Sequence, residues 1–310
     1  MIQYVIKRVL QTVPVLFGVI VITFVLMYLI PGDPVVSMVG ERYDEKTIEI
    51  LREELGLDEP ILHQFINYVT SVCHGDLGKS YVTGEEVMGS ILERFPRTII
   101  LAITAMIVAI ILGLTMGMLS SLRPESALDK TIMFLSLAGI STPVFWLGIL
   151  FMLFFGVYLN WLPPTGFGGI KYIVLPAVTL GIRSAAYIAR LTRATMIEVF
   201  EQDYIRTARM KNVSEGRILI KHGLPNILIP VITLIGTDFG SYLSGAVLTE
   251  SIFGWPGIGR FALDAILKRD FPVIQGTVLF MAIIFIITNL LVDICYGFID
   301  PRIRMEEKNN

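Results

Sequence analysis

The sequence predicts an all-α polytopic protein that crosses a membrane six times. Of its 310 residues, 54% are hydrophobic and 17% are charged, whereas charged residues make up about 25% of an average soluble domain. Its apolar runs have the length that a helix needs to cross a bilayer, about 20 residues. The net charge of −2 does not suggest a nucleic-acid partner. This composition excludes an ordinary soluble globular domain.

The predicted spans follow the apolar runs in chain order. Pro31 and Gly32 end the first run, because proline removes a backbone donor and glycine favours turns. Gly113 and Gly117 suit close contact of the second run with another helix. Pro143 is expected to kink the third run. The six runs cover residues 9–30, 98–120, 131–156, 172–191, 227–247 and 273–299.

Lysine and arginine residues collect on one side of this topology. They are concentrated at the N-terminus, in residues 122–130 and 190–225, and in the C-terminal tail. The positive-inside rule places these segments and both termini in the cytoplasm. We therefore expect four regions, which are a cytoplasmic N-terminus with the first span (1–30), an extracytoplasmic loop domain (31–97), a five-helix membrane core (98–299) and a cytoplasmic tail (300–310).

The loop 31–97 is acidic and too long to be a simple connection. Helical stretches such as 45–55 predict a small folded cap. This cap is a surface for an extracytoplasmic partner, a guard of a substrate entrance, or a solvated acidic face, and the sequence leaves these open. Residues 75–80 (GDLGKS) end like a phosphate-binding loop, but Cys73 stands where the first glycine is needed. We reject a nucleotide site there. Because the sequence contains no other phosphate-binding loop of this type, any ATP hydrolysis must come from a separate subunit.

Residues 198–225 form a polar, helix-forming segment between two apolar runs. Apolar residues near helical spacing predict a first short helix over 198–211. Asn212 tolerates the left-handed conformation that ends a helix, and Ser214 can cap a second helix. With small Ala208 before the turn and charges of both signs, the segment looks like a docking surface at the membrane face. The alternative is an ordinary amphipathic loop.

The same segment resembles the cytoplasmic coupling loop of ABC-importer permeases. That loop has the pattern Glu-Ala-Ala, three residues, Gly, nine residues, Ile-x-Leu-Pro, and here Ala208, Leu224 and Pro225 match at the right spacing. Arg-Thr-Ala over 206–208 is similar to the peptide and nickel branch, while Asn212 replaces the glycine even of that branch. Further stretches that resemble this branch are 161–166, 175–177, 250–259, 269–276 and 300–302.

The resemblance is to a B-type permease subunit, and it implies a Type I importer fold that works by alternating access. It implies a homologous second permease, two cytoplasmic ATPase subunits that bind ATP and magnesium, and an extracytoplasmic substrate-binding protein. It places the chain in the cytoplasmic membrane of a bacterium or archaeon, with no cofactor of its own. Dipeptides, oligopeptides, nickel and metal chelates all stay open as cargo. The residues expected to contact the ATPase are Arg206, Thr207, Ala208, Arg209, Asn212 and Glu215.

Ionisable residues within the spans are few, and they are costly at that depth unless they face a cavity or a partner. Asp238, one turn before Tyr242, is either a pathway residue that attracts a cationic or amine-bearing substrate or a structural carboxylate. Asp293 with Asn289 suits contacts between helices, and Arg183 could pair with a carboxylate that the sequence does not identify. A proton-coupled secondary transporter that uses Asp238 and Asp293 is the rival function, and a receptor or scaffold without transport is a third.

Enzymatic function is not indicated. No predicted span contains a histidine, and the sequence has no His-Glu-x-x-His, no Gly-x-Ser-x-Gly and no Cys/His cluster. Two scattered cysteines predict neither a disulfide nor a metal site. His63 and His74 in the outer loop are weak candidates for contact with a transition metal during import. Trp255 and Phe253 can lie at the depth of the lipid headgroups, and Trp161 is expected to be a membrane anchor without a further role.

Overall fold

The computed structural model describes residues 2–29, 35, 45–54, 56–243 and 246–299. Every named element in these ranges is a helix, and one isolated antiparallel bridge joins Lys79 and Glu86. The all-α prediction is therefore confirmed for this part of the chain. The predicted tail, with its motif at 300–302, lies outside the described residues.

Four helices are long and apolar enough to cross a membrane, and two bent pairs raise the possible number of spans to six. One bent pair consists of Glu215–Leu228 and Pro230–Leu243, which meet at 54° within α11 (Leu224–Leu243). The described residues thus contain four to six candidate spans, and the number six stays a prediction. The four helices are α1 (Ile2–Leu29), α5 (Val87–Leu122), α8 (Ile170–Phe200) and α14 (Phe271–Ile299).

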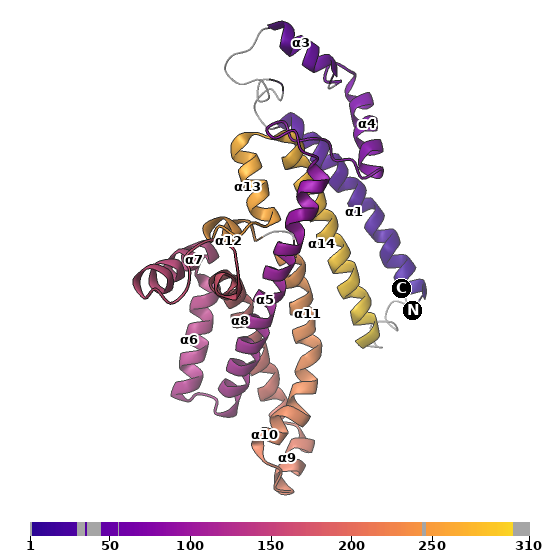
Figure 1. Ribbon diagram of the computed structural model, residues 1–310. Coiled ribbons are helices and arrows are strands. Elements are labelled where there is room, and N and C mark those ends of the chain that lie inside the picture. The colour runs from indigo at the N-terminus through magenta and orange to yellow at the C-terminus, as the bar shows by residue number, and fades with distance from the viewer. Residues whose placement is uncertain (1, 30–34, 36–44, 55, 244–245, 300–310) are drawn as a thin grey trace.

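The predicted third span, 131–156, is the other bent pair. α6 (Ala127–Ser141) meets α7 (Val144–Phe151) at 108°, and a π-helix over Met152–Tyr158 continues α7. The break lies at Pro143, whose extended backbone (ψ 131°) precedes α7. Proline removes a backbone donor and disfavours helix at the residue before it. The break predicted at Pro143 is confirmed, and the turn is far larger than a kink within one straight span (Figure 1).

α5 and α8 pack along each other at the centre of the molecule (Figure 1). Gly113 and Gly117 lie on the contact face of α5, where a Cβ on either would come within 2.6 Å of a side chain of α8. Gly181 of α8 makes the reverse contact, because a Cβ there would lie 2.5 Å from the carbonyl oxygen of Ala105. The close helix packing predicted for the glycine pair is confirmed, and the largest buried cluster surrounds it.

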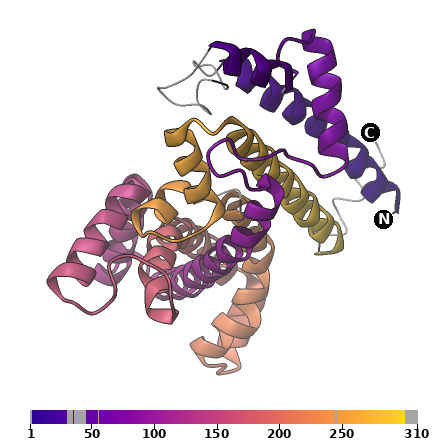
Figure 2. The same ribbon diagram turned by 45° about the horizontal axis from the view of Figure 1, so that its top comes forward.

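α1 lies beside α14 and apart from α8 (Figures 1 and 2). Arg8 Nη1 and Asp293 Oδ2, 3.0 Å apart, join the first turns of α1 to the last turns of α14. Large apolar side chains on the outward faces are exposed, among them Leu10 of α1, Phe134 of α6 and Leu291 of α14. Exposed apolar surface of this extent is typical of a membrane-facing surface.

The region predicted as an outer loop domain rests on α1. Its helices are α3 (Glu45–Glu54) and α4 (Ile61–Cys73), which lie at the end of the molecule opposite the α5–α6 connection (Figure 1). Phe24 of α1 packs against Phe65 and Tyr68 of α4, with ring centroids 5.2 and 5.9 Å apart. α5 already begins at Val87, so the helix starts inside the range 31–97.

Candidate functional site

Residues 201–223, the α9–α10 segment, project from the end of α8 at one extreme of the molecule (Figure 1). α8 continues to Phe200, and α9 (Asp203–Met210), α10 (Glu215–Ile218) and a π-helical turn over Leu219–Gly223 follow. The prediction of one helix over 198–211 is wrong. The chain breaks at 201–202, where Gln202 takes the extended backbone (ψ 145°) of a residue that precedes a new helix.

The turn between α9 and α10 has the predicted geometry. Asn212 is left-handed, with φ 54°. Its N–H donates to Arg209 O (2.9 Å), and the N–H of Val213 donates to Ala208 O (3.2 Å), which is the pattern of a Schellman cap. Ser214 precedes α10 with an extended backbone, but its side chain makes no capping bond. Asparagine thus takes the backbone role that glycine has in the resembling loops.

Ala208 lies inside the α9–α10 segment. It is 9% exposed and packs in a small cluster with Val199 of α8, Ile205 of α9 and Ile218 of α10. Its role in the structure is therefore to hold these three helices together from within. The contact between Ala208 and an ATPase stays a prediction.

The other five predicted coupling residues lie on the surface of the segment. Arg209 and Glu215 bridge α9 and α10, with Nε and Nη2 donating to the two carboxylate oxygens at 2.9 and 3.2 Å. Arg206 is exposed and makes a loose pair with Asp203, 3.6 Å apart. The structure thus brings these five residues together in one exposed patch, which the Arg209–Glu215 pair stabilises across the turn.

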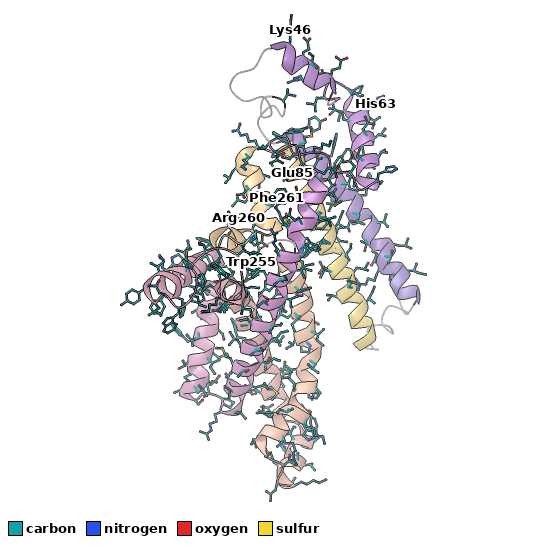
Figure 3. The ribbon with its side chains drawn as sticks, in the orientation of Figure 1. Lys46, His63, Glu85, Trp255, Arg260 and Phe261 are labelled. Atoms are coloured by element: carbon teal, nitrogen blue, oxygen red, sulfur yellow. The ribbon has the colours of Figure 1, made fainter. Side chains whose placement is uncertain are left out.

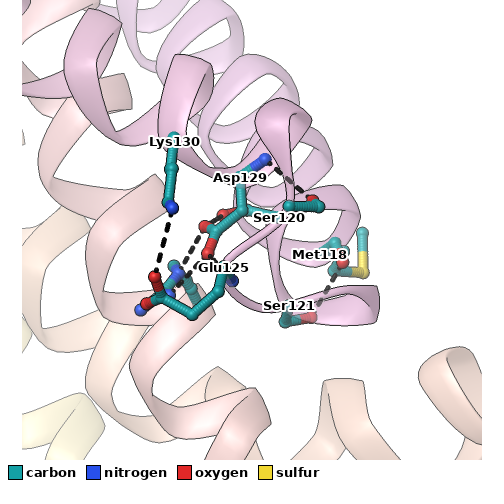
Figure 4. Close-up of polar contacts among 8 residues, drawn as sticks. Met118, Ser120, Ser121, Glu125, Asp129 and Lys130 are labelled. Atoms are coloured by element: carbon teal, nitrogen blue, oxygen red, sulfur yellow. Dashed lines mark hydrogen bonds and ion pairs between the residues drawn. The ribbon is translucent and has the colours of Figure 1, made fainter.

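A buried carboxylate that the sequence analysis missed, Asp129, fastens α5 and α6 to α8 close to this end (Figure 4). Arg193 of α8 donates Nε and Nη2 to its two oxygens, each at 2.6 Å. Ser120 of α5 donates to Oδ1, and the N–H of Glu125 donates to Oδ2 (2.8 Å). Ser126 accepts from the N–H of Asp129 (3.2 Å), so the Ser-x-x-Asp pattern of a helix start was the available signal.

The two predicted pathway residues line one cavity between α7, α8 and α11, with a volume of about 430 Å³. Tyr242 is buried, and its hydroxyl donates to Leu180 O (3.0 Å) and lies 2.5 Å from Ser184 Oγ. Asp238 is half-buried one turn away, and Arg183 of α8 lines the same cavity. The arrangement can bind a polar, charged ligand.

Asp293 does not share this cavity. It pairs with Arg8 of α1 at 3.0 Å, and the residues that line the cavity come from α7, α8, α11 and the start of α12. The predicted role of Asp293 as a contact between helices is confirmed. The structure therefore does not bring together the two carboxylates on which a proton-coupled transporter would depend.

Glu250, a second buried carboxylate that the sequence analysis missed, holds the segment 250–259 in place. It lies on α12 (Val247–Ile252) and is fully buried. Thr98 of α5 donates to Oε1 (2.8 Å), and the N–H of Arg260 on α13 (Ile258–Lys268) donates to Oε2 (3.1 Å). Because burial outweighs these neutral donors, the pKa of Glu250 lies above its ordinary value. A Cβ on Gly257 would lie 2.2 Å from this carboxylate, which explains the glycine beside it.

The aromatic residues of this segment are interior, so Trp255 and Phe253 are not exposed membrane anchors, and their depth in the bilayer stays a prediction. They are 3% and 2% exposed. Trp255 Nε1 donates to Arg97 O (3.0 Å) where α12 and α13 meet α5 (Figure 3). Trp161 is exposed, as a membrane anchor requires.

The described residues contain no group of three or more metal-ligating side chains. His63 lies on α4, far from the cavity-lining helices (Figure 3). His74 follows α4, and its Nδ1 lies 2.8 Å from Thr70 O. The structure does not bring the two histidines together with a third ligand.

The chain matches two family descriptions that together span nearly all of it. Residues 109–305 match the binding-protein-dependent transport system inner membrane component. Residues 1–102 match the N-terminal part of the binding-protein-dependent transport system membrane component.

Curated relatives are similar over the full length. The chain is 43% identical to the glutathione transport system permease protein GsiC of Escherichia coli O6:H1, over 98% of this chain and 99% of that protein. It is 42% identical to the proteins of the same name from Escherichia coli K12 and Shigella dysenteriae serotype 1, with the same coverage.

Solved structures share the fold. A chain of the inward-facing MetNI methionine ABC transporter aligns with a TM-score of 0.58 at 17% identity, over 69% of this chain and 97% of that chain. A chain of an amino acid ABC transporter with histidines aligns with a TM-score of 0.51 at 16% identity, over 69% and 94%. Their likeness supports the importer-permease fold that the sequence predicts.

Proposed function

The chain belongs to the family of binding-protein-dependent transport system inner membrane components, as a permease subunit of an ABC importer, and from this we propose that it imports small peptides. Members of this family are transport components and not enzymes. The observation that carries the substrate class is the 43% identity to a glutathione transport permease over 98% of the chain. Membership also implies an ATPase and a substrate-binding protein as partners.

In our proposal the α9–α10 segment is the coupling site for the ATPase. It extends beyond the ends of the long helices and presents the exposed side chains of Arg206, Thr207 and Asn212. Beneath this surface, Ala208 joins α9 to α8, and α8 is fastened to α5 and α6 through Asp129. Closure of the ATPases would therefore move α8 together with its neighbours and drive alternating access.

The remaining parts of the proposal concern the assembly. A homologous second permease pairs with this chain, and ATP and magnesium bind to the ATPase subunits. Six spans place both termini and the α9–α10 segment in the cytoplasm, in agreement with the distribution of lysine and arginine. The assembly lies in the cytoplasmic membrane of a bacterium or archaeon.

The test is uptake by cells that express the chain with its neighbouring subunits, supplied with labelled glutathione, a labelled dipeptide or labelled nickel. Ala208→Glu places a charge in the cluster that holds α9, so we expect loss of peptide uptake and of the co-purified ATPase. Ala127→Glu is the matched control, because Ala127 is exposed at the start of α6, and we expect uptake to be retained. Uptake of nickel and of neither peptide would contradict the peptide substrate, and peptide uptake that survives Ala208→Glu would contradict the coupling site.

A further inference from the structure

The cavity between α7, α8 and α11 carries side chains of both charges. Arg183 reaches it from α8 and Asp238 from α11. Within the described residues, the ion pairs of the spanning helices are made elsewhere, and Arg183 has the ring of Tyr187 as a neighbour, 6.0 Å from its guanidinium carbon. The two charges therefore face the same space without neutralising each other in an ion pair.

The location of these charges requires a polar environment. Arg183 lies near the middle of α8 and is exposed in the isolated chain, and Asp238 is half-buried on the neighbouring helix. A charge that faces hydrocarbon at this depth is costly, so such residues face a water-filled path or a partner. This side of α8 and α11 thus borders a polar path or a partner subunit and not lipid.

The rest of the wall is rich in hydroxyl groups and is rigidly held. Tyr242 donates to Leu180 O and, through its contact with Ser184 Oγ, ties α11 to α8. This link sets the separation of the helices that carry the two charges. The volume of about 430 Å³ falls in the range of pockets for small ligands, roughly 300–1,000 Å³.

We propose that this cavity is a transit site for zwitterionic peptides with free termini, in which Arg183 binds the carboxylate and Asp238 binds the ammonium group. This inference rests on the proposed function and extends it to the site of recognition. A guanidinium donates paired N–H bonds to a carboxylate, and a carboxylate accepts from an ammonium group. A ligand with a single charge would leave the opposite charge of the wall uncompensated, whereas a zwitterion satisfies both.

The experiment measures peptide taken up per ATP hydrolysed in proteoliposomes that hold this chain with its second permease and ATPases, with excess binding protein and labelled dialanine outside. Asp238→Asn and Arg183→Gln each remove one charge, and we expect about a tenfold fall in the ratio for each, because each loses one charge-assisted interaction. Asp238→Glu should restore most of the ratio. Arg190→Gln is the matched control, since Arg190 is exposed on the same helix and does not line the cavity.

Each of the following results, if observed in place of the expected fall, would contradict one part of the proposal. An unchanged ratio in both neutralised variants would remove the cavity from the path. A fall only in Asp238→Asn would indicate a cation site. Loss of the second permease from the purified Arg183→Gln complex would place the arginine in a subunit interface. A wild-type complex that does not transport dialanine but transports another cargo would contradict the proposed peptide function itself.

Discussion

Two buried carboxylates contact α5 at two separate levels and hold it in different ways. About three turns into α5, Thr98 donates to Glu250, which otherwise accepts from backbone N–H groups. Near its end, Ser120 donates to Asp129, which forms a two-bond ion pair with Arg193. Thr98 and Ser120 are about 33 Å apart along the helix at 1.5 Å per residue, close to the thickness of a bilayer's hydrocarbon core.

The difference shows which contact of α5 is fixed and which can respond to its surroundings. A buried ion pair needs both charges, because removal of one leaves the other uncompensated. A carboxyl group held by neutral donors avoids the cost of a buried charge when it is protonated. We infer that the contact near the α9–α10 segment is firm, as the proposed coupling requires, and that the contact at Glu250 depends on pH.

The largest expected effect is on the ion pair. Asp129→Ala should lower the free energy of unfolding by about 3 kcal/mol, because Arg193 would remain partly buried without its anion. The measurement is the thermal unfolding midpoint of the purified protein in detergent. Lys130→Ala is the control, since it breaks only an exposed pair with Glu125, 3.6 Å apart, expected to contribute less than about 1 kcal/mol. Equal shifts in both variants would contradict the comparison.

A smaller loss of stability is expected at the Glu250 contact. Glu250→Ala should lower the free energy of unfolding by about 2 kcal/mol, because the Thr98 hydroxyl and the N–H of Arg260 lose their buried acceptor. The measurement is again the thermal unfolding midpoint of the purified protein in detergent. Asp264→Ala removes a half-exposed acid from neighbouring α13 and should leave the midpoint nearly unchanged. A Glu250→Ala variant as stable as this control would show that the buried contact does not stabilise the fold.

The smallest expected effect is a pH dependence that Glu250 alone confers. Its pKa is raised in the folded chain, so the folded chain binds more protons than the unfolded chain between the ordinary and the raised pKa. Stability should therefore increase as pH falls through this window. In Glu250→Gln this side chain cannot titrate. The slope of stability against pH in the wild type minus the same slope in the variant therefore isolates the effect. A difference of the opposite sign would mean that the folded chain favours the charged form.

Local sequence signals predicted much of the fold. The apolar runs located the long helices, Pro143 marked the break between α6 and α7, and Asn212 marked the turn after α9. Each of these depends on the residue itself and its near neighbours. The break at 201–202 was missed, because an apolar pattern that continues from α8 into α9 does not show where the helix axis changes direction.

The contacts within the candidate sites were less predictable. Asp238 and Tyr242 could be named from depth in a span, but Arg183 and Ser184 join them from another helix. Glu250 was part of a resembling stretch and gave no sign that it would be buried against Thr98. Such contacts bring together residues that are far apart in the sequence, so periodicity and motif spacing do not report them.

The sequence by itself determined the class of this protein, its family and the position of the polar α9–α10 segment, because hydrophobic length, helix-breaking residues and short motifs are local properties. Only the tertiary structure decided that Ala208 faces inward, that Asp293 pairs with Arg8 and that Arg183 and Asp238 line one cavity. The physical reason is that burial and charge compensation depend on the groups that packing places opposite a side chain. Those groups come from other helices.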